Sequence, residues 1–289
     1  MKVSAQVANF NVVFGNEERP MLDYFDSIIY PAFLSEIEKS GKNQDTYFFR
    51  EIEVIKNKNG DAAIIGRIIK RTILEVFSDL NERGDLVEKD EHYSSAPYST
   101  FIIYLRNHRM LFVPNQKGSP TLTNFKSAVE YILKKFISNY NSKNEKKLPY
   151  VLVNIVGVPS AKSLEELLKT VKKINSLTLK FYPLNGDVDF SDVFGIMSTD
   201  LRKAVGSKTG QIVLNSPKSM GGVVGVLQQA GGTINPILRV TTSEDTVVKL
   251  QDDQMTEKYE MEMEPKLTLE QKKKQIIDKA NEIDTLRFT

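Results

Sequence analysis

Short clusters of lysine and arginine are the residues of this chain whose type and spacing best fit a chemical task, the neutralisation of phosphate. Two of them flank predicted turns or helix ends, from which long basic side chains can reach a duplex backbone. They are Arg67, Lys70 and Arg71 in one group and Arg202, Lys203 and Lys208 in the other. Such clusters are also common on ordinary solvated faces, so both interpretations stay open.

A glycine-rich connection offers a second candidate for phosphate binding. Lys218 precedes Gly221 and Gly222 at the start of a predicted helix, where backbone N–H groups and an ammonium can meet an anion. The spacing matches neither GxGxxG nor GxxxxGK[ST]. A close-packed connection between a strand and a helix, in which glycine is tolerated for its small size, explains the same residues.

Recognisable catalytic residues are absent from the sequence. His92 and His108 have no carboxylate at a supporting spacing, and we expect both to be exposed turn residues. The chain has no cysteine, which excludes disulfides, thiolate metal sites and a cysteine nucleophile. The segment 85–89 contains carboxylates and a lysine, but too close together for a nuclease site. We therefore expect no metal, no cofactor and no catalytic residue.

The composition narrows the class of protein. The 289 residues carry 39 basic and 37 acidic side chains, a net charge of +2, so nucleic-acid binding would need a local basic patch. No apolar run reaches the length of a membrane-spanning helix, and the first residues do not resemble a signal peptide. These features predict a cytoplasmic protein.

The first half of the chain reads as strands with few helices. A helix is predicted over 21–39, with Pro31 breaking or bending it, and another begins at Ser119-Pro120 with a hydroxyl cap. Asn59-Gly60 predicts a hairpin turn, and Arg83-Gly84-Asp85 predicts another turn. The predicted strands are 3–14, 46–55, 62–69, 99–105 and 110–113.

The second half alternates between the two kinds of element. The polar tract 139–147 predicts a boundary between a β-rich α+β domain (1–140) and a mixed α/β domain (148–289) with a C-terminal helix. Ser163 and Glu166 match a capping box. The predicted strands are 150–156, 177–182, 211–214, 237–241, 246–250 and 255–263. One predicted helix starts at Ser163, and three others span 191–205, 222–230 and 267–287.

The order of these elements resembles the RexA-like phage-exclusion proteins. The resemblance is carried by a hairpin, proline and helix in SSAPYSTFIIYLRNHRMLFVPNQKGSPTLTNF, followed by FSDVFGIMSTDLRKAV and LNSPKSMGGVVGVLQQAGG. It implies a homodimer of a bacterial anti-phage (abortive infection) system that binds DNA with little sequence preference and signals to a membrane-protein partner. It maps no functional residue onto a position of this chain.

The leading hypothesis is therefore a non-catalytic protein that binds double-stranded DNA through backbone contacts. One alternative is a metal-dependent nuclease or toxin-like enzyme whose site is too dispersed to recognise. Another is a protein-binding scaffold, in which Glu260, Glu262 and Glu264 and the C-terminal helix hold a partner subunit.

Overall fold

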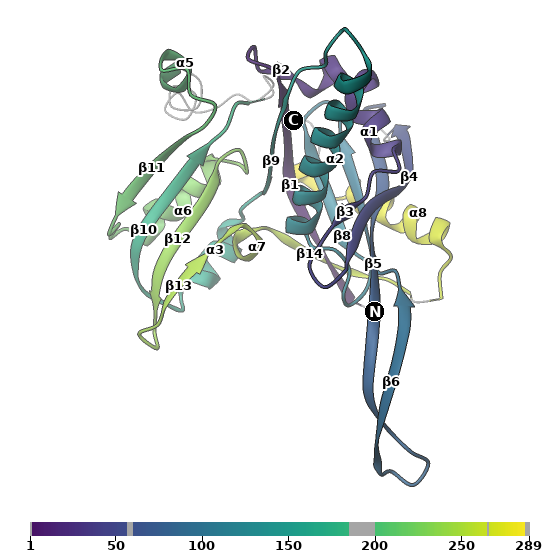
Figure 1. Cartoon of the computed structure of the whole chain (residues 1–289). Helices are drawn as coiled ribbons and strands as arrows, with labels where there is room; N and C mark the ends of the chain where they lie inside the picture. Colours follow the sequence, from purple (N-terminus) through teal and green to yellow (C-terminus); the bar gives the residue numbers. More distant parts are fainter. Residues whose placement is uncertain (1, 57–59, 185–199, 265, 287–289) are drawn as a thin grey trace.

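Two separate β-sheets organise the chain, in a computed structural model that describes residues 2–56, 60–184, 200–264 and 266–286. The first is a ten-stranded curled sheet with the order β14-β1-β8-β7-β5-β4-β3, to which β2 and β9 add along β1 and β6 adds along β5. The second has four strands in the order β11-β10-β12-β13. The mixed α+β class expected from the sequence is confirmed (Figure 1).

The long strand β1 (Lys2–Phe14) pairs with four other strands of the first sheet. One part pairs with β14 (Lys258–Glu262), and the rest pairs with β8 (Arg109–Pro114) and β9 (Val151–Gly157). The other members are β2 (Arg19–Pro20), β3 (Lys39–Ser40), β4 (Thr46–Lys56), β5 (Ala62–Leu80), β6 (Leu86–Ser95) and β7 (Tyr98–Tyr104). The predicted hairpins of β4 with β5 and of β7 with β8 are confirmed, and Asn59 lies outside the described residues.

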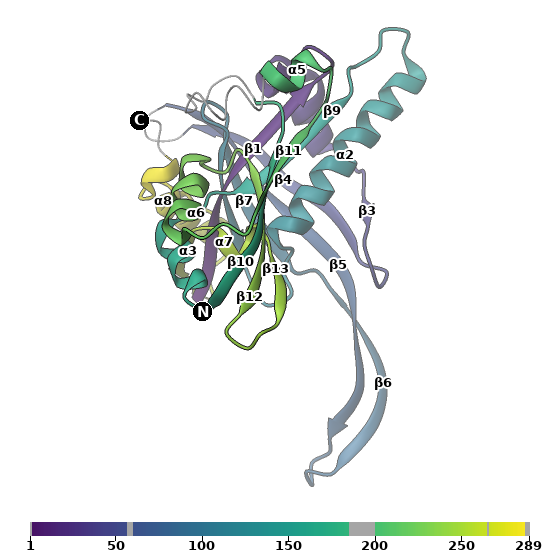
Figure 2. The ribbon, with the colours of Figure 1, turned by 90° about the vertical axis from the view of Figure 1, so that its left-hand side faces the viewer.

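The helix α2 (Leu122–Lys143) covers one face of this sheet (Figures 1 and 2). Its apolar face meets an aromatic cluster in which Phe125 contacts Phe10, Phe49 and Phe101. The predicted cap at Ser119 was wrong. Thr121 is the N-cap and forms a capping box with Asn124, while Pro120 lies before the helix.

The helix predicted over 21–39 is broken into three short turns. They are η1 (Met21–Tyr24), a π-helical turn η2 (Phe25–Ile29) and α1 (Tyr30–Leu34). Pro31 lies in the first turn of α1, where its missing N–H costs no helical hydrogen bond. The irregular turns before α1 are consistent with the clash that proline would make inside a longer helix.

A two-stranded arm leaves the first sheet. The strand β5 continues to Leu80, beyond the predicted end at 69, and β6 returns antiparallel to it. The predicted turn at residues 83–85 joins them, with Gly84 at a φ of 83°. The arm, residues 72–95, extends away from both sheets (Figures 1 and 2).

Among the described residues, helices cover only one face of the second sheet (Figure 2). Its strands are β10 (Val171–Phe181), β11 (Gly210–Asn215), β12 (Asn235–Thr242) and β13 (Val247–Leu250). The helices α3 (Ala161–Leu168) and α6 (Met220–Gln229) bury apolar side chains against it. The predicted cap of α3 at Ser163 was wrong, because the Ser160 hydroxyl accepts from the Ser163 N–H.

Part of the helix predicted over 191–205 lies outside the described residues, and the described part contains α5 (Arg202–Ala204). The last elements of the chain are α7 (Asp252–Met255), α8 (Leu269–Ala280) and η4 (Asp284–Leu286). The predicted period-two strand near the C-terminus is confirmed as β14, in which Met261 is buried and Glu260 and Glu262 are exposed.

The polar tract 139–147 does not separate the two sheets. It contains the end of α2, and β9 beyond it pairs with β1 over seven residues. The strand β14 also pairs with β1, and α8 buries Ile276 and Ala280 in a cluster with Val3 and other residues of the first sheet. The chain therefore leaves the first sheet after β9, forms the second sheet with β10–β13, and returns to the first sheet at β14.

Candidate functional site

Arg67 is an interior residue of the first sheet. Its guanidinium pairs with the carboxylate of Glu51, donates to the Leu269 carbonyl oxygen at 3.2 Å and lies 5.3 Å from the centroid of the Tyr98 ring. Burial lowers the pKa of Arg67, since the charged form loses hydration. Only 5% of the residue is exposed, so the predicted DNA contact at Arg67 was wrong.

Lys70 and Arg71, at the base of the arm, are both held by carboxylates. The Lys70 Nζ lies 3.0 Å from Asp45 Oδ2. The Arg71 guanidinium donates twice to Glu38, at 2.8 and 3.1 Å, and stacks over the Phe48 ring. These neighbours leave little net positive charge at this group.

In the second predicted group, two of the three cations, Arg202 and Lys203 of α5, share the carboxylate of Glu18. Arg202 is 4% exposed and pairs with Glu18, whose carboxylate also lies 3.7 Å from Lys203 Nζ. Lys208 is exposed and lies over the Tyr150 ring, 4.1 Å from its centroid. A buried Arg202 cannot touch a duplex, so the predicted DNA contact at this residue was wrong.

The two histidines have different environments. His92 is exposed on the arm, and its Nε2 lies 3.1 Å from Asp90 Oδ1. His108 is 1% exposed, and its backbone oxygen accepts from the Phe10 N–H. The prediction of an exposed His108 was therefore wrong, because its turn packs against β1 and does not project into solvent.

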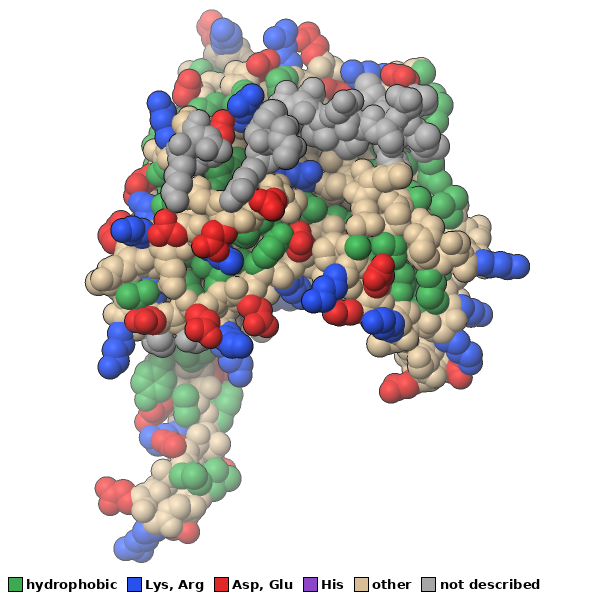
Figure 3. Space-filling model, turned by 180° about the vertical axis from the view of Figure 1, so that it is seen from behind, with side chains coloured by type: hydrophobic (Ala, Val, Ile, Leu, Met, Phe, Trp, Pro, Cys, Tyr) green, Lys and Arg blue, Asp and Glu red, His purple; other side chains and the backbone are tan. Residues whose placement is uncertain are grey.

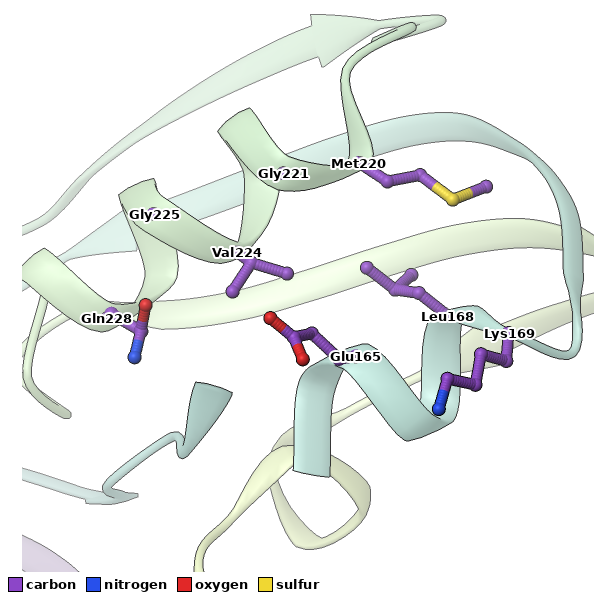
Figure 4. A pocket seen from close by; sticks show the side chains of 8 residues that line it. All are labelled: Glu165, Leu168, Lys169, Met220, Gly221, Val224, Gly225 and Gln228. Atoms are coloured by element: carbon purple, nitrogen blue, oxygen red, sulfur yellow. The ribbon is translucent and has the colours of Figure 1, made fainter. Parts of the chain in front are cut away.

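The glycine-rich start of α6 does not assemble the predicted phosphate site. Ser219 caps the helix by accepting from the Gly222 N–H, and Lys218 is exposed. A groove of about 350 Å³ runs between α6 and α3, and its walls include Gly221 but not Lys218 or Gly222. Glu165 points into this groove from α3, and Lys169 also lines it, so the groove carries one carboxylate and one ammonium and no surplus of positive charge for an anion (Figure 4).

The face of the second sheet opposite α3 and α6 carries a different set of cations. Strand alternation places the buried residues Leu177 and Leu238 against the helices, so their neighbours in sequence point to the opposite side. We call this side the outer face. Its cations are Lys173 and Lys180 from β10, Arg239 from β12 and Lys249 from β13.

The outer face is positively charged. The four strands are fully described, and none of their residues is acidic. Among the described residues, no ion pair involves Lys173, Lys180, Arg239 or Lys249. Arg239 and Lys249 lie directly opposite each other in the β12–β13 ladder. Like charges in that position destabilise a sheet, so a counter-anion at this place would be stabilising.

Sequence reasoning did not select these residues. Only Lys173 falls in a cluster of lysines in the sequence, whereas Lys180, Arg239 and Lys249 are single cations within apolar strands. The signal that could have found them is period-two alternation in each predicted strand. These four cations lie on one face because β10, β12 and β13 are neighbours in the sheet. The alternation within each strand does not predict which strands become neighbours.

Other kinds of site have less support. Across the described ranges, no three His, Asp or Glu side chains come together in a group that could hold a metal ion. None of the helices in that same part of the chain has the length and hydrophobicity that a membrane span needs.

Comparison with known proteins gives a family and no function. The chain has no match among curated proteins. A family described as "Domain of unknown function (DUF4747)" matches residues 3–220, which include β10 and β11 of the second sheet. Since this match spans well over half of the sequence, the chain belongs to the DUF4747 family.

Proposed function

We propose that this protein binds DNA through phosphate contacts on the outer face of the second sheet, without catalysing a reaction. The observation that carries the proposal is the Arg239–Lys249 pair, two like charges held opposite each other on a face whose four strands contain no acidic residue. Lys173 and Lys180 extend the same positive surface along β10. The duplex backbone is a dense row of anions that fits such a surface.

The chemistry of the outer face favours contacts to the backbone over contacts to bases. Its other side chains include the polar residues Ser176, Thr178 and Asn215 and the aliphatic residues Val213, Ile237 and Val247, and its strands place no aromatic ring there. Base stacking on aromatic rings is the usual way in which a sheet holds single strands. Without it, a duplex is the better ligand, and binding through phosphates should depend little on sequence because phosphate contacts carry no sequence information.

The wider setting rests on the resemblance in sequence. A role in an anti-phage system, a homodimer, a cytoplasmic location and a membrane-protein partner stay predictions. The scaffold alternative gives the C-terminal helix the task of holding a partner subunit, whereas α8 buries Ile276 and Ala280 against the first sheet of its own chain. The nuclease alternative has no group of carboxylates to support it among the described residues.

The test is a salt titration of binding to a fluorescent duplex of arbitrary sequence, followed by anisotropy. Four phosphate contacts predict a slope of log K against log salt of about −3.6, or roughly two orders of magnitude of affinity lost between about 50 and 200 mM salt. Replacing Lys249 with alanine should make the slope shallower by about 0.9. The triple variant Lys180→Glu, Arg239→Glu, Lys249→Glu should abolish binding.

A matched control reverses three exposed cations elsewhere, Lys117, Lys146 and Lys162. It changes the net charge by the same amount, so it should retain the salt slope if the outer face is the site. Equal losses in both triple variants would mean that net charge alone decides binding. A salt slope near zero in the wild-type protein would contradict the proposal.

A further inference from the structure

The arm presents more apolar surface to solvent than a soluble hairpin needs. Six large side chains of residues 72–95 are at least half exposed, and Figure 3 shows apolar atoms along the arm. They are Ile73, Leu74, Phe77, Leu80, Leu86 and Tyr93. A lone two-stranded hairpin is marginally stable in water, and a contiguous exposed apolar surface usually marks an interface. The arm therefore needs a covering surface.

The charges of the arm indicate what kind of surface covers it. Residues 72–95 contain seven carboxylates and only two cations, Arg83 and Lys89. The ammonium of Lys89 is already shared by Asp79 and Glu91, each at 3.2 Å. Glu75, Glu82 and Glu88 are exposed and have no ion pair among the described residues. The partner surface should be both apolar and positive.

The outer face of the second sheet has these two properties. Between its cations lie Val213, Ile237 and Val247, of which Val247 is 61% exposed. Packing one arm against another would instead bring two acidic surfaces together, at a cost in repulsion. Within one molecule the arm extends away from the second sheet (Figures 1 and 2). A second copy of this chain supplies the matching surface.

We propose that two copies form a dimer by reciprocal exchange, in which the arm of each covers the outer face of the other. Apolar side chains such as Leu74 and Leu86 pack against the valines and isoleucine of that face, and the arm's carboxylates meet its cations. Reciprocal contacts close the assembly at two copies, as a two-fold axis requires. The dimer itself depends only on this complementarity of charge and on the apolar surface of both partners.

If the outer face binds DNA, as in the proposed function on which this step rests, the arm and DNA compete for it. Because the arm and DNA would occupy the same cations, the dimer is the closed form of the protein and DNA must displace the arm. Shortening the arm should then raise the affinity for DNA, while charge reversal on the outer face should remove both activities. Dimerisation without DNA binding would refute the proposed function and leave the dimer in place.

The experiment swaps the charges of the two surfaces in the full-length chain. The arm variant carries Glu75→Lys, Glu82→Lys and Glu88→Lys. The face variant carries Lys180→Glu, Arg239→Glu and Lys249→Glu. Mass is measured by light scattering after size-exclusion chromatography at low and high salt, with circular dichroism as a check of folding. The control is the triple reversal at Lys117, Lys146 and Lys162.

We expect the wild-type protein and the control to be dimers at low salt that dissociate as salt rises. Each swapped variant alone should be a monomer, and an equimolar mixture of the two should recover a dimer, since their charges are again complementary. A wild-type monomer at every salt concentration would overturn the proposal. So would folded variants that fail to associate on mixing, or dimers that persist in the arm variant.

Discussion

Glu18 and Arg202 form a buried ion pair that joins the end of β1 to the segment before β11. Arg202 Nη1 lies 2.5 Å from Glu18 Oε1, and Nη2 donates to Oε2 at 2.7 Å. The same guanidinium donates to the Ser207 carbonyl oxygen at 2.8 Å. Both side chains are largely shielded from solvent, at 3% and 13% exposure, so the pair holds the two sheets together in a place that water hardly reaches.

Replacing Arg202 with methionine should lower the free energy of unfolding by up to about 3 kcal/mol, because the largely buried Glu18 carboxylate then keeps only the exposed Lys203, 3.7 Å away, as a counter-charge. Urea denaturation followed by circular dichroism measures the change. The matched control is Arg71→Met, which breaks the more exposed pair with Glu38 and should cost no more than about 1 kcal/mol. Equal effects of the two substitutions would show that Arg202 is not a buried anchor.

Gly157 lies at the end of β9, where the chain crosses the segment before β14. A Cβ atom at this position would overlap the side chain of Thr256. Gly157→Ala should therefore lower the free energy of unfolding by about 1–3 kcal/mol, and adding Thr256→Gly should recover part of that loss. Thermal denaturation of the single and double variants tests this coupling.

Gly210 supplies the control for Gly157. A Cβ atom there meets no atom within 4 Å, and the residue begins the edge strand β11. Gly210→Ala should leave the melting temperature unchanged or raise it slightly, since alanine restricts the unfolded chain more than glycine does. A large loss in both alanine variants would show that the crossing at Thr256 is not the cause.

Tyr259 should make stability depend on alkaline pH. Burial, the largest cause, raises the pKa of its phenol to about 12, against 10.0 for a free tyrosine. Below pH 10 both states keep the proton, so this residue adds no pH dependence. Between about pH 10 and 12 the unfolded chain loses the proton first, and the free energy of unfolding falls. Tyr259→Phe should weaken this fall and remove a late component from the phenolate absorbance titration.

Thr121 fixes the start of α2 through its capping box with Asn124. Thr121→Ala should lower the free energy of unfolding by about 1 kcal/mol, because the Asn124 N–H loses its acceptor. Ser138→Ala, at an exposed position inside the same helix, should be neutral or slightly stabilising. If the two substitutions had the same effect, the cap would not be at Thr121.

Local patterns predicted much of the secondary structure. Alternation in residues 258–263 and apolar runs in 46–55 and 99–105 each correspond to a strand, because side chains on a pleated strand must face opposite sides. The helix predicted over 21–39 ends at Leu34, earlier than its apolar periodicity indicated, and the turns before Pro31 are irregular, as the predicted break or bend at this proline implied. The length of the arm was also missed, because β5 beyond Lys70 lacks a clean alternating pattern.

The candidate site was the harder prediction. Clusters of cations in the sequence drew attention to Arg67 and Arg202, whose partners Glu51 and Glu18 come from other segments that tertiary folding brings near. Conversely, Arg239 and Lys249 are ten residues apart in the sequence and become opposite neighbours only through the β12–β13 register.

The sequence by itself determined the class of the fold, most of its strands, the turn at residues 83–85 and the lack of cysteine chemistry, since these depend on local patterning and composition. Tertiary structure decided that β9 and β14 belong to the first sheet and that α8 packs against that sheet. It also decided which cations have a carboxylate beside them. The physical reason is that strand pairing and ion pairs join residues distant in sequence. The acidic segment 72–95 is contiguous in the sequence, whereas the basic outer face is assembled from three separate strands only after folding.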